Sequence, residues 1–120
     1  KENLQFALSF RYNSQPITKI QKVLDHFELS RFSSEPISVF SKGMLQRLKL
    51  AYVELSSWDL LLFDEPFTGL DKNGIDLVGQ LIKKWRDNNK TVIMVLHNEH
   101  RAKQIADKKL LIDSGKIILD

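Results

Sequence analysis

The sequence predicts an α/β fold in which a mostly parallel sheet follows an α-helical segment. Two apolar runs, residues 60–63 (LLLF) and 91–96 (TVIMVL), have the length of strands that are buried on both faces of a parallel sheet. The stretch between them, 72–88, carries apolar residues at helical spacing, and a strand–helix–strand order is typical of a parallel crossover. No clear strand pattern precedes residue 60. We therefore expect an α-helical part over residues 1–57 and a sheet-containing part over 58–120.

The composition bounds the class of protein. Of the 120 residues, 42% are hydrophobic and 28% are charged, which is ordinary for a globular domain. The net charge is +3, and because the basic residues are spread among acids, the charge does not indicate a nucleic-acid partner. Cysteine is absent, so disulfides and thiolate metal sites are excluded. No apolar run reaches the roughly 18 residues that cross a bilayer. Since the chain starts with Lys1 rather than Met, we expect a fragment.

Three helices are expected before the first strand. Residues 1–12 and 17–29 each show an apolar side at helical spacing, Ser14 is a candidate cap for the second helix, and a polar loop follows over 30–36. The third helix begins behind Ser41, which is a good N-cap residue. The apolar faces of the second and third helices are expected to hold Ile17, Ile20, Val23, Leu24 and Phe27, and Met44, Leu45, Leu48, Ala51, Tyr52 and Leu55.

The start of the third helix is a candidate anion site. A helix N-terminus offers free N–H donors and the positive end of the helix dipole. Ser41 adds a hydroxyl group, Lys42 adds a positive charge, and Gly43 lets backbone N–H groups approach a ligand closely. The same three residues also suit an ordinary helix start, so by themselves they leave both interpretations open.

Acidic residues at the end of the first strand are a second candidate site. Asp64 and Glu65 follow the apolar run directly, and Pro66 ends the strand because it cannot donate a ladder hydrogen bond. In open α/β sheets, ligands bind at the carboxyl ends of strands. One acid there can hold a metal ion through water while the other takes a proton from an attacking water. An acidic pair at this place can also simply start a solvated turn. His97 ends the second strand in the same way.

The last part of the chain predicts a short helix over residues 99–106 and a β-hairpin. Its strands are expected at 110–112 and 116–119, because Asp113, Ser114 and Gly115 between them suit a tight turn with Gly in the left-handed conformation.

Taken together, these residues resemble the ATP-binding subunit of an ABC transporter. Residues 40–44 (FSKGM) look like the signature motif of that family, and 60–65 look like its Walker B strand with the catalytic glutamate. Residues 68–71 (TGLD) look like the D-loop, and His97 stands where the switch histidine is expected. The order and spacing of the four elements match. The resemblance implies a partial P-loop NTPase core, with the signature motif in an α-helical subdomain.

The resemblance implies a role in ATP hydrolysis for three of these side chains. Glu65 would be the general base that polarises the attacking water, His97 would hydrogen-bond the γ-phosphate, and Asp64 would support Mg²⁺ through a water molecule. Phosphoryl transfer depends on such positioning and charge neutralisation more than on covalent chemistry.

Further implied roles concern partners. Ser41, Lys42 and the backbone of Gly43 would grip the γ-phosphate of ATP held by a second ATP-binding subunit, and Asp71 would contact the phosphate loop of that subunit. A transmembrane subunit would be the other partner, and no nucleic acid is expected. The protein would be cytoplasmic and peripheral on the inner face of the cell membrane.

The sequence departs from the family pattern within the signature motif. Lys42 stands where Gly is commoner and Met44 where Gln is commoner, while Gln46 and Arg47 follow as is usual. Lys42 adds attraction to phosphate, and Met44 removes a side-chain hydrogen bond. We do not expect these changes to inactivate the protein.

The larger departure is an absence. A phosphate loop requires GxxxxGK followed by Ser or Thr. Gly69 and Gly74 have the right spacing, but Ile75 and Asp76 follow them, and no Q-loop glutamine stands upstream. The resemblance therefore covers the C-terminal part of such a subunit, without Walker A and Q-loop segments. In the family's sheet, the phosphate-loop strand lies between the strand that ends at His97 and the next one. Without it we expect an exposed apolar edge or a gap, self-association or altered sheet packing, and no hydrolysis by the chain alone.

The sequence is compatible with three functions. The first is the transport-coupled ATPase just described. The second is a soluble ABC-type ATPase outside transport, which usually shows tandem domains, long insertions or coiled coils that this sequence lacks. The third is an inactive, truncated module that only binds a partner. The transported substrate is not encoded here, because in this family the membrane subunit selects it.

Overall fold

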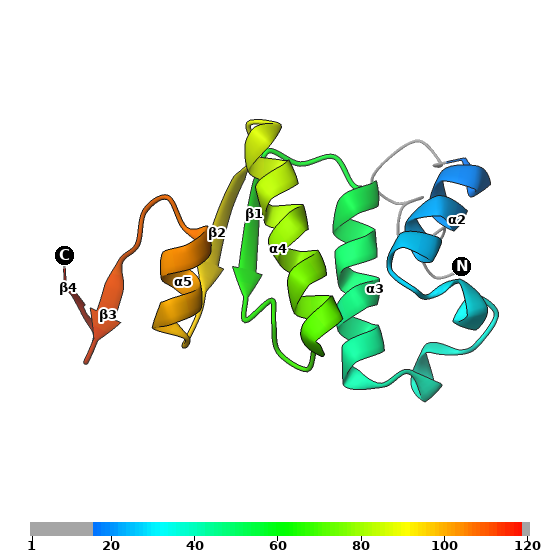
Figure 1. Cartoon of the computed structure of the whole chain (residues 1–120), viewed down its shortest axis with the longest axis horizontal. Coiled ribbons are helices and arrows are strands. Elements are labelled where there is room, and N and C mark those ends of the chain that lie inside the picture. The colour runs from blue at the N-terminus through cyan, green and yellow to red at the C-terminus, as the bar shows by residue number, and fades with distance from the viewer. Residues whose placement is uncertain (1–15, 119–120) are drawn as a thin grey trace.

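The computed structural model describes residues 16–118 and arranges them as helices stacked beside a small sheet (Figure 1). The expected helix over 1–12 and the proposed cap Ser14 lie outside the described residues. The helices are α2 (Ile17–His26), α3 (Lys42–Leu55), α4 (Lys72–Asp87) and α5 (Glu99–Ile105), with 3₁₀ turns η1 (Ser30–Phe32) and η2 (Ile37–Val39). The strands are β1 (Leu60–Asp64), β2 (Thr91–Val95), β3 (Leu111–Asp113) and β4 (Lys116–Ile118).

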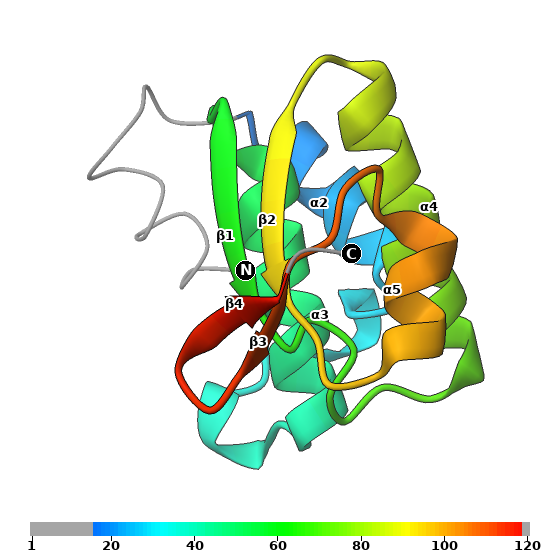
Figure 2. The same ribbon diagram turned by 90° about the vertical axis from the view of Figure 1, so that its left-hand side faces the viewer.

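The hydrophobic core lies between α2, α3, α4 and one face of the β1–β2 sheet. Figure 2 shows the two strands in front of these helices. The core contains apolar side chains from each of the three helices, joined by Phe67 from the loop after β1. This single cluster contains residues from both sides of position 57. The division into parts 1–57 and 58–120 therefore stays a prediction. The buried members are Ile20, Leu24, Phe27, Leu29, Leu50, Ala51, Leu55, Phe67, Val78, Leu81, Ile82 and Trp85.

Helix α2 is shorter than the sequence predicts. The expected range 17–29 is wrong at its end, because Glu28 adopts a left-handed conformation (φ 58°) that closes the helix. The Leu29 N–H then donates to the Leu24 carbonyl over 2.8 Å, a hydrogen bond of the kind that closes helix C-termini. Ile17 is 54% exposed rather than buried, because it is the first residue of the helix and projects beyond the packed turns.

Helix α3 begins behind its predicted cap, and α4 begins behind Asp71, for which no capping role was predicted. The Ser41 hydroxyl accepts from the Met44 N–H, as expected of the N-cap of α3. The Asp71 carboxylate caps α4 in the same way by accepting from the Gly74 N–H. Leu50, which the predicted apolar face of α3 omitted, is fully buried, so that face is wider than expected.

The two central strands pair in parallel, as predicted, in a register that runs from Leu60 beside Thr91 to Asp64 beside Val95. The expectation that both strands are buried on both faces is wrong. Along each strand the exposure alternates, because the described helices cover only one face of the sheet. On the other face, the cross-strand partners Leu62 and Ile93 are 70% and 56% exposed. This exposed face is distinct from the exposed edge or gap that the missing phosphate-loop strand predicts. For that expectation, the relevant finding is that β2 pairs only with β1 among the described residues and is not joined to β3.

Strands β3 and β4 form a separate antiparallel sheet rather than extending the first one. Ser114 and Gly115 between them both have positive φ values, 49° and 75°, which fits a two-residue type I′ turn. The predicted hairpin is therefore confirmed, with its first strand one residue later than expected. Across the described part of the chain, no helix has the length and hydrophobicity of a transmembrane segment.

Candidate functional site

The two candidate catalytic residues meet where β1 and β2 end. Glu65 follows β1 in a left-handed conformation (φ 46°), which is uncommon for a residue other than glycine. Its N–H donates to the Val95 carbonyl over 3.1 Å, and its own carbonyl accepts from the Thr68 N–H over the same distance. The turn therefore starts at Glu65 and is hydrogen-bonded to β2.

His97 holds the carboxylate of Glu65 through its backbone. The His97 N–H donates to Oε1 of Glu65 over 2.8 Å. The imidazole Nε2 of His97 lies 3.7 Å from the same oxygen, and its side chain is 89% exposed. The Glu65 side chain is 32% exposed. The carboxylate is thus oriented by a backbone donor and remains open to solvent, which suits a group that polarises a water molecule.

Asp64 is the last residue of β1 and faces the uncovered side of the sheet. Its exposure matches that of Leu60 and Leu62, as the alternation along a strand requires. Within the described residues, its carboxylate makes no hydrogen bond or ion pair. No group of three or more acidic or histidine side chains there is arranged to hold a metal ion. A single free carboxylate still fits Mg²⁺, which takes one or two carboxylates and completes its shell with water and substrate phosphates.

The first turn of α3 packs against the loop that precedes α4. A Cβ atom at Gly43 would lie 2.9 Å from the Gly69 carbonyl oxygen, closer than real Cβ atoms come. Gly69 itself has a positive φ of 77°. Both glycines are therefore needed for the contact between the signature segment and the loop 68–71. Ser41 and Lys42 are exposed at the same helix end, beside Gly43.

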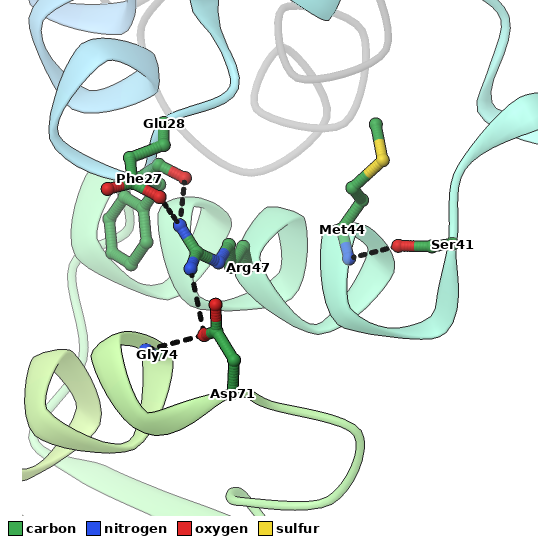
Figure 3. A network of polar contacts seen from close by, with 7 residues as sticks. All are labelled: Phe27, Glu28, Ser41, Met44, Arg47, Asp71 and Gly74. Carbon is green, nitrogen blue, oxygen red and sulfur yellow. Dashed lines mark hydrogen bonds and ion pairs between the residues drawn. The ribbon is translucent and has the colours of Figure 1, made fainter.

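Arg47 joins three parts of the chain (Figure 3). Its Nη1 forms an ion pair with Glu28 and donates to the Phe27 carbonyl over 3.4 Å, and its Nη2 donates to Oδ1 of Asp71 over 3.1 Å. The Arg47 side chain is only 12% exposed. Burial by itself would lower the pKa of Arg47, but the hydrogen bonds and charges of Glu28 and Asp71 outweigh it and raise this pKa.

Asp71 is held from two sides by its own chain. The Gly74 N–H donates to Oδ1 of Asp71 over 2.9 Å, and Arg47 donates to the same oxygen. The pKa of Asp71 is lowered, first by the Gly74 N–H and then by Arg47, because both favour the ionised carboxylate. The side chain is 66% exposed, so its contacts with α3 and α4 leave it accessible to another molecule.

The structure thus brings Glu65 to His97 and the segment 41–43 to the loop before Asp71. It also adds two residues that the sequence prediction gave no role. Gln46 donates from Nε2 to the Pro66 carbonyl over 2.9 Å, so α3 also holds the turn that starts at Glu65. Arg47 had a usable signal, because it lies four residues before Ala51 on the buried face of the helix. A charged group on that face requires a partner. No such signal marks Gln46.

The family model described as ABC transporter matches residues 1–68. The chain is 30% identical over 98% of its length to the ABC transporter ATP-binding protein NatA of Bacillus subtilis. It is 34% identical over 75% of its length to the manganese transport system ATP-binding protein MntB of Listeria innocua, and 31% identical over 98% to the Nod factor export ATP-binding protein I of Ralstonia nicotianae.

The chain spans only part of these relatives: 49% of NatA, 38% of MntB and 37% of the Nod factor export protein. Among solved structures, it is similar to an inward-facing conformation of a protein assigned as a metal-chelate type ABC transporter, with a TM-score of 0.73 and 24% identity. That match covers 96% of this chain and 49% of the other. It agrees with the partial α/β fold.

Proposed function

This chain belongs to the ABC transporter family, whose model matches more than half of its length, and we propose that it forms part of an ATP-binding subunit that hydrolyses ATP. The observation that carries the proposal is the hydrogen bond from the His97 N–H to the Glu65 carboxylate at the paired ends of β1 and β2. This hydrogen bond orients a solvent-accessible carboxylate at the strand ends, where ligands bind in α/β sheets, and so supports a general base at Glu65.

In the proposed reaction, Glu65 accepts a hydrogen bond from the attacking water and draws the proton from it as the water approaches the γ-phosphate. The backbone of His97 keeps the carboxylate in place, and its exposed imidazole is free to hydrogen-bond the phosphate. Asp64 would hold Mg²⁺, through a water molecule. The ion would supply charge neutralisation on the phosphates.

Ser41, Lys42 and Gly43 are proposed to bind the γ-phosphate of ATP held by a second ATP-binding subunit. The exposure of Ser41 and Lys42 at the N-terminus of the 14-residue helix α3 supports this. Asp71 is proposed to contact the same partner, and its accessible carboxylate supports this. Both groups are tied together inside this chain, through the Gly43–Gly69 contact and through Arg47. ATP would then join two subunits, and hydrolysis would release them.

The phosphate loop that cradles ATP is proposed to come from a stretch of polypeptide other than residues 1–120, because this sequence contains no GxxxxGK motif. The edge of β2 that has no paired strand among the described residues supports a missing neighbouring strand. The proposed partner in transport is a transmembrane subunit, with the ATP-binding subunit on the cytoplasmic side of the membrane. The transport named for relatives such as MntB supports this part of the proposal.

The test is ATP hydrolysis by the intact protein that carries this chain. Glu65→Gln is expected to lower the turnover number by about 10²-fold or more, since general bases contribute on that order, and to leave MgATP binding in place. The matched control is Glu35→Gln, which changes an exposed acid in the loop before α3. Unchanged turnover in Glu65→Gln would refute the proposed base, and intact protein with no turnover would favour an inactive binding module.

A further inference from the structure

A second contact joins the loops that carry Glu65 and His97. We propose that Arg101 is a positioning residue: its contact with Phe67 maintains the hydrogen bond from the His97 N–H to the Glu65 carboxylate. The effect of Arg101 on the His97 N–H follows from the geometry alone. The effect of Arg101 on ATP hydrolysis rests on the proposed function.

The contact is a cation–π interaction. The guanidinium carbon Cζ of Arg101 lies 4.5 Å from the centroid of the Phe67 ring, within the roughly 6 Å over which such contacts are attractive. Phe67 is only 6% exposed, so its ring is held within the core. The backbone N–H of Arg101 donates to Oδ1 of Asn98 over 2.9 Å, which caps α5. Arg101 is therefore fixed at its backbone and at the end of its side chain.

The two residues lie close in sequence to the candidate catalytic pair. Phe67 follows Glu65 by two positions, and Arg101 follows His97 by four, within the first turn of α5. The cation–π contact thus bridges the same two loops as the hydrogen bond from His97 to Glu65. A shift of α5 away from Phe67 would carry the His97 backbone away from the carboxylate.

Helix α5 is attached to the core at its end, where Ile105 packs against it, so a contact near its start restrains the part that follows His97. It has seven residues, and none of them is buried. Its ion pairs run from Glu99 to Lys103 and Lys109 and are exposed, so they contribute little to its position. Phe67, by contrast, belongs to the hydrophobic core, and the carbonyl of the preceding Pro66 accepts from Gln46. Phe67 is therefore held in place by the core, and its contact with Arg101 restrains α5.

The first test measures amide hydrogen exchange at His97 in the intact protein without nucleotide. Loss of a cation–π contact that contributes about 0.5–1 kcal/mol corresponds to about a two- to fivefold change in an equilibrium. Arg101→Gln is expected to raise the exchange rate of the His97 amide by about that factor. Arg101→Lys, which keeps a cation near the ring, is expected to restore most of the protection. The matched control is Lys103→Gln on the same helix, with no change at His97.

The second test measures ATP turnover in the same variants. Arg101→Gln is expected to lower kcat by about two- to fivefold and to leave KM unchanged, because it alters the position of the base rather than ATP binding. Phe67→Leu is expected to lower kcat similarly, and the double variant no further than either single one. Equal His97 exchange in Arg101→Gln and wild type would overturn the inference, whatever the turnover. Absence of turnover in the wild type would instead refute the proposed function, and the exchange result would still decide the positioning role.

Discussion

The guanidinium of Arg47 donates a hydrogen bond to the carboxylate of Asp71 over 3.1 Å, and so α3 holds the N-cap residue of α4. Helix α3 starts with the signature segment 41–43, and Asp71 ends the loop that packs against that segment. The two surfaces proposed to meet a second subunit are therefore fixed to each other by contacts within one chain. We expect them to engage or release that subunit together.

Replacement of Arg47 tests how strongly this contact holds the fold. Arg47→Met keeps the helix propensity and the apolar stem but removes the donors to Asp71, Glu28 and the Phe27 carbonyl. Because the guanidinium is mostly buried and bonds charged groups, we expect a loss of about 1.5–3 kcal/mol in the free energy of unfolding. The control is Arg86→Met, whose ion pair with Asp107 is exposed and whose loss should change stability by about 0.5 kcal/mol or less. Urea unfolding measures both, and equal effects would contradict the prediction.

Two glycines give opposite predictions for the same substitution. Gly43→Ala places a Cβ atom 2.9 Å from the backbone oxygen of Gly69, so we expect a loss of about 1–3 kcal/mol as the loop is forced away from α3. Gly79 lies inside α4, and no atom of residues 16–118 comes within 4 Å of a Cβ placed there, so Gly79→Ala should stabilise the protein by about 0.5–1 kcal/mol through helix propensity. Thermal unfolding decides the signs. A stabilising Gly43→Ala would show that the contact is loose.

Protonation of Asp71 should contribute to the pH dependence of stability. Its pKa is lowered in the folded state, so its contribution is complete above the unfolded-state pKa of about 3.9 and is lost as the pH falls through the folded value. Asp71→Asn keeps an N-cap but removes the charge. We expect wild type to exceed this variant in stability at about pH 6, with the difference shrinking toward about pH 2.5. Urea unfolding across this range measures it, and a constant difference would contradict the prediction.

The exposed face of the β1–β2 sheet predicts self-association of the 120-residue chain. Leu62 and Ile93 are cross-strand partners on that face. The outer edges of β1 and β2, which pair with no other strand among the described residues, add unpaired backbone groups. The variant with Leu62→Thr and Ile93→Thr should shift the average mass toward the monomer and change stability little. The control is Leu110→Thr, an exposed apolar residue outside this sheet. Analytical sedimentation measures the average mass. A wild-type chain that stays monomeric at high concentration would contradict the prediction.

Local patterns in the sequence predicted the central strand–helix–strand unit well. The apolar runs that became β1 and β2 are bounded by Pro66 and His97, and Ser41 caps α3 as predicted. The same runs misled on burial, because four apolar residues in a row look alike whether one face or both are covered. Which face is covered depends on the packing of distant helices, and the local pattern does not contain it.

The candidate site was predicted residue by residue, but its internal connections were not. The sequence places Glu65 and His97 at strand ends, yet the hydrogen bond between them depends on the parallel register and on the left-handed turn at Glu65. Arg47 meets Asp71, 24 positions further along the chain, only because α3 packs against the start of α4. Arg101 and Phe67 meet for the same kind of reason. Contacts of this type follow from the tertiary fold rather than from spacing.

The measurement that tests the central claim most directly is calorimetry of MgATP binding to the 120-residue chain. The claim is that the chain carries the residues for hydrolysis but lacks the phosphate cradle. We expect no binding in the micromolar range, because no phosphate loop is present in the sequence. Tight binding with one nucleotide per chain would contradict this account, since the chain would then form a complete phosphate site by itself.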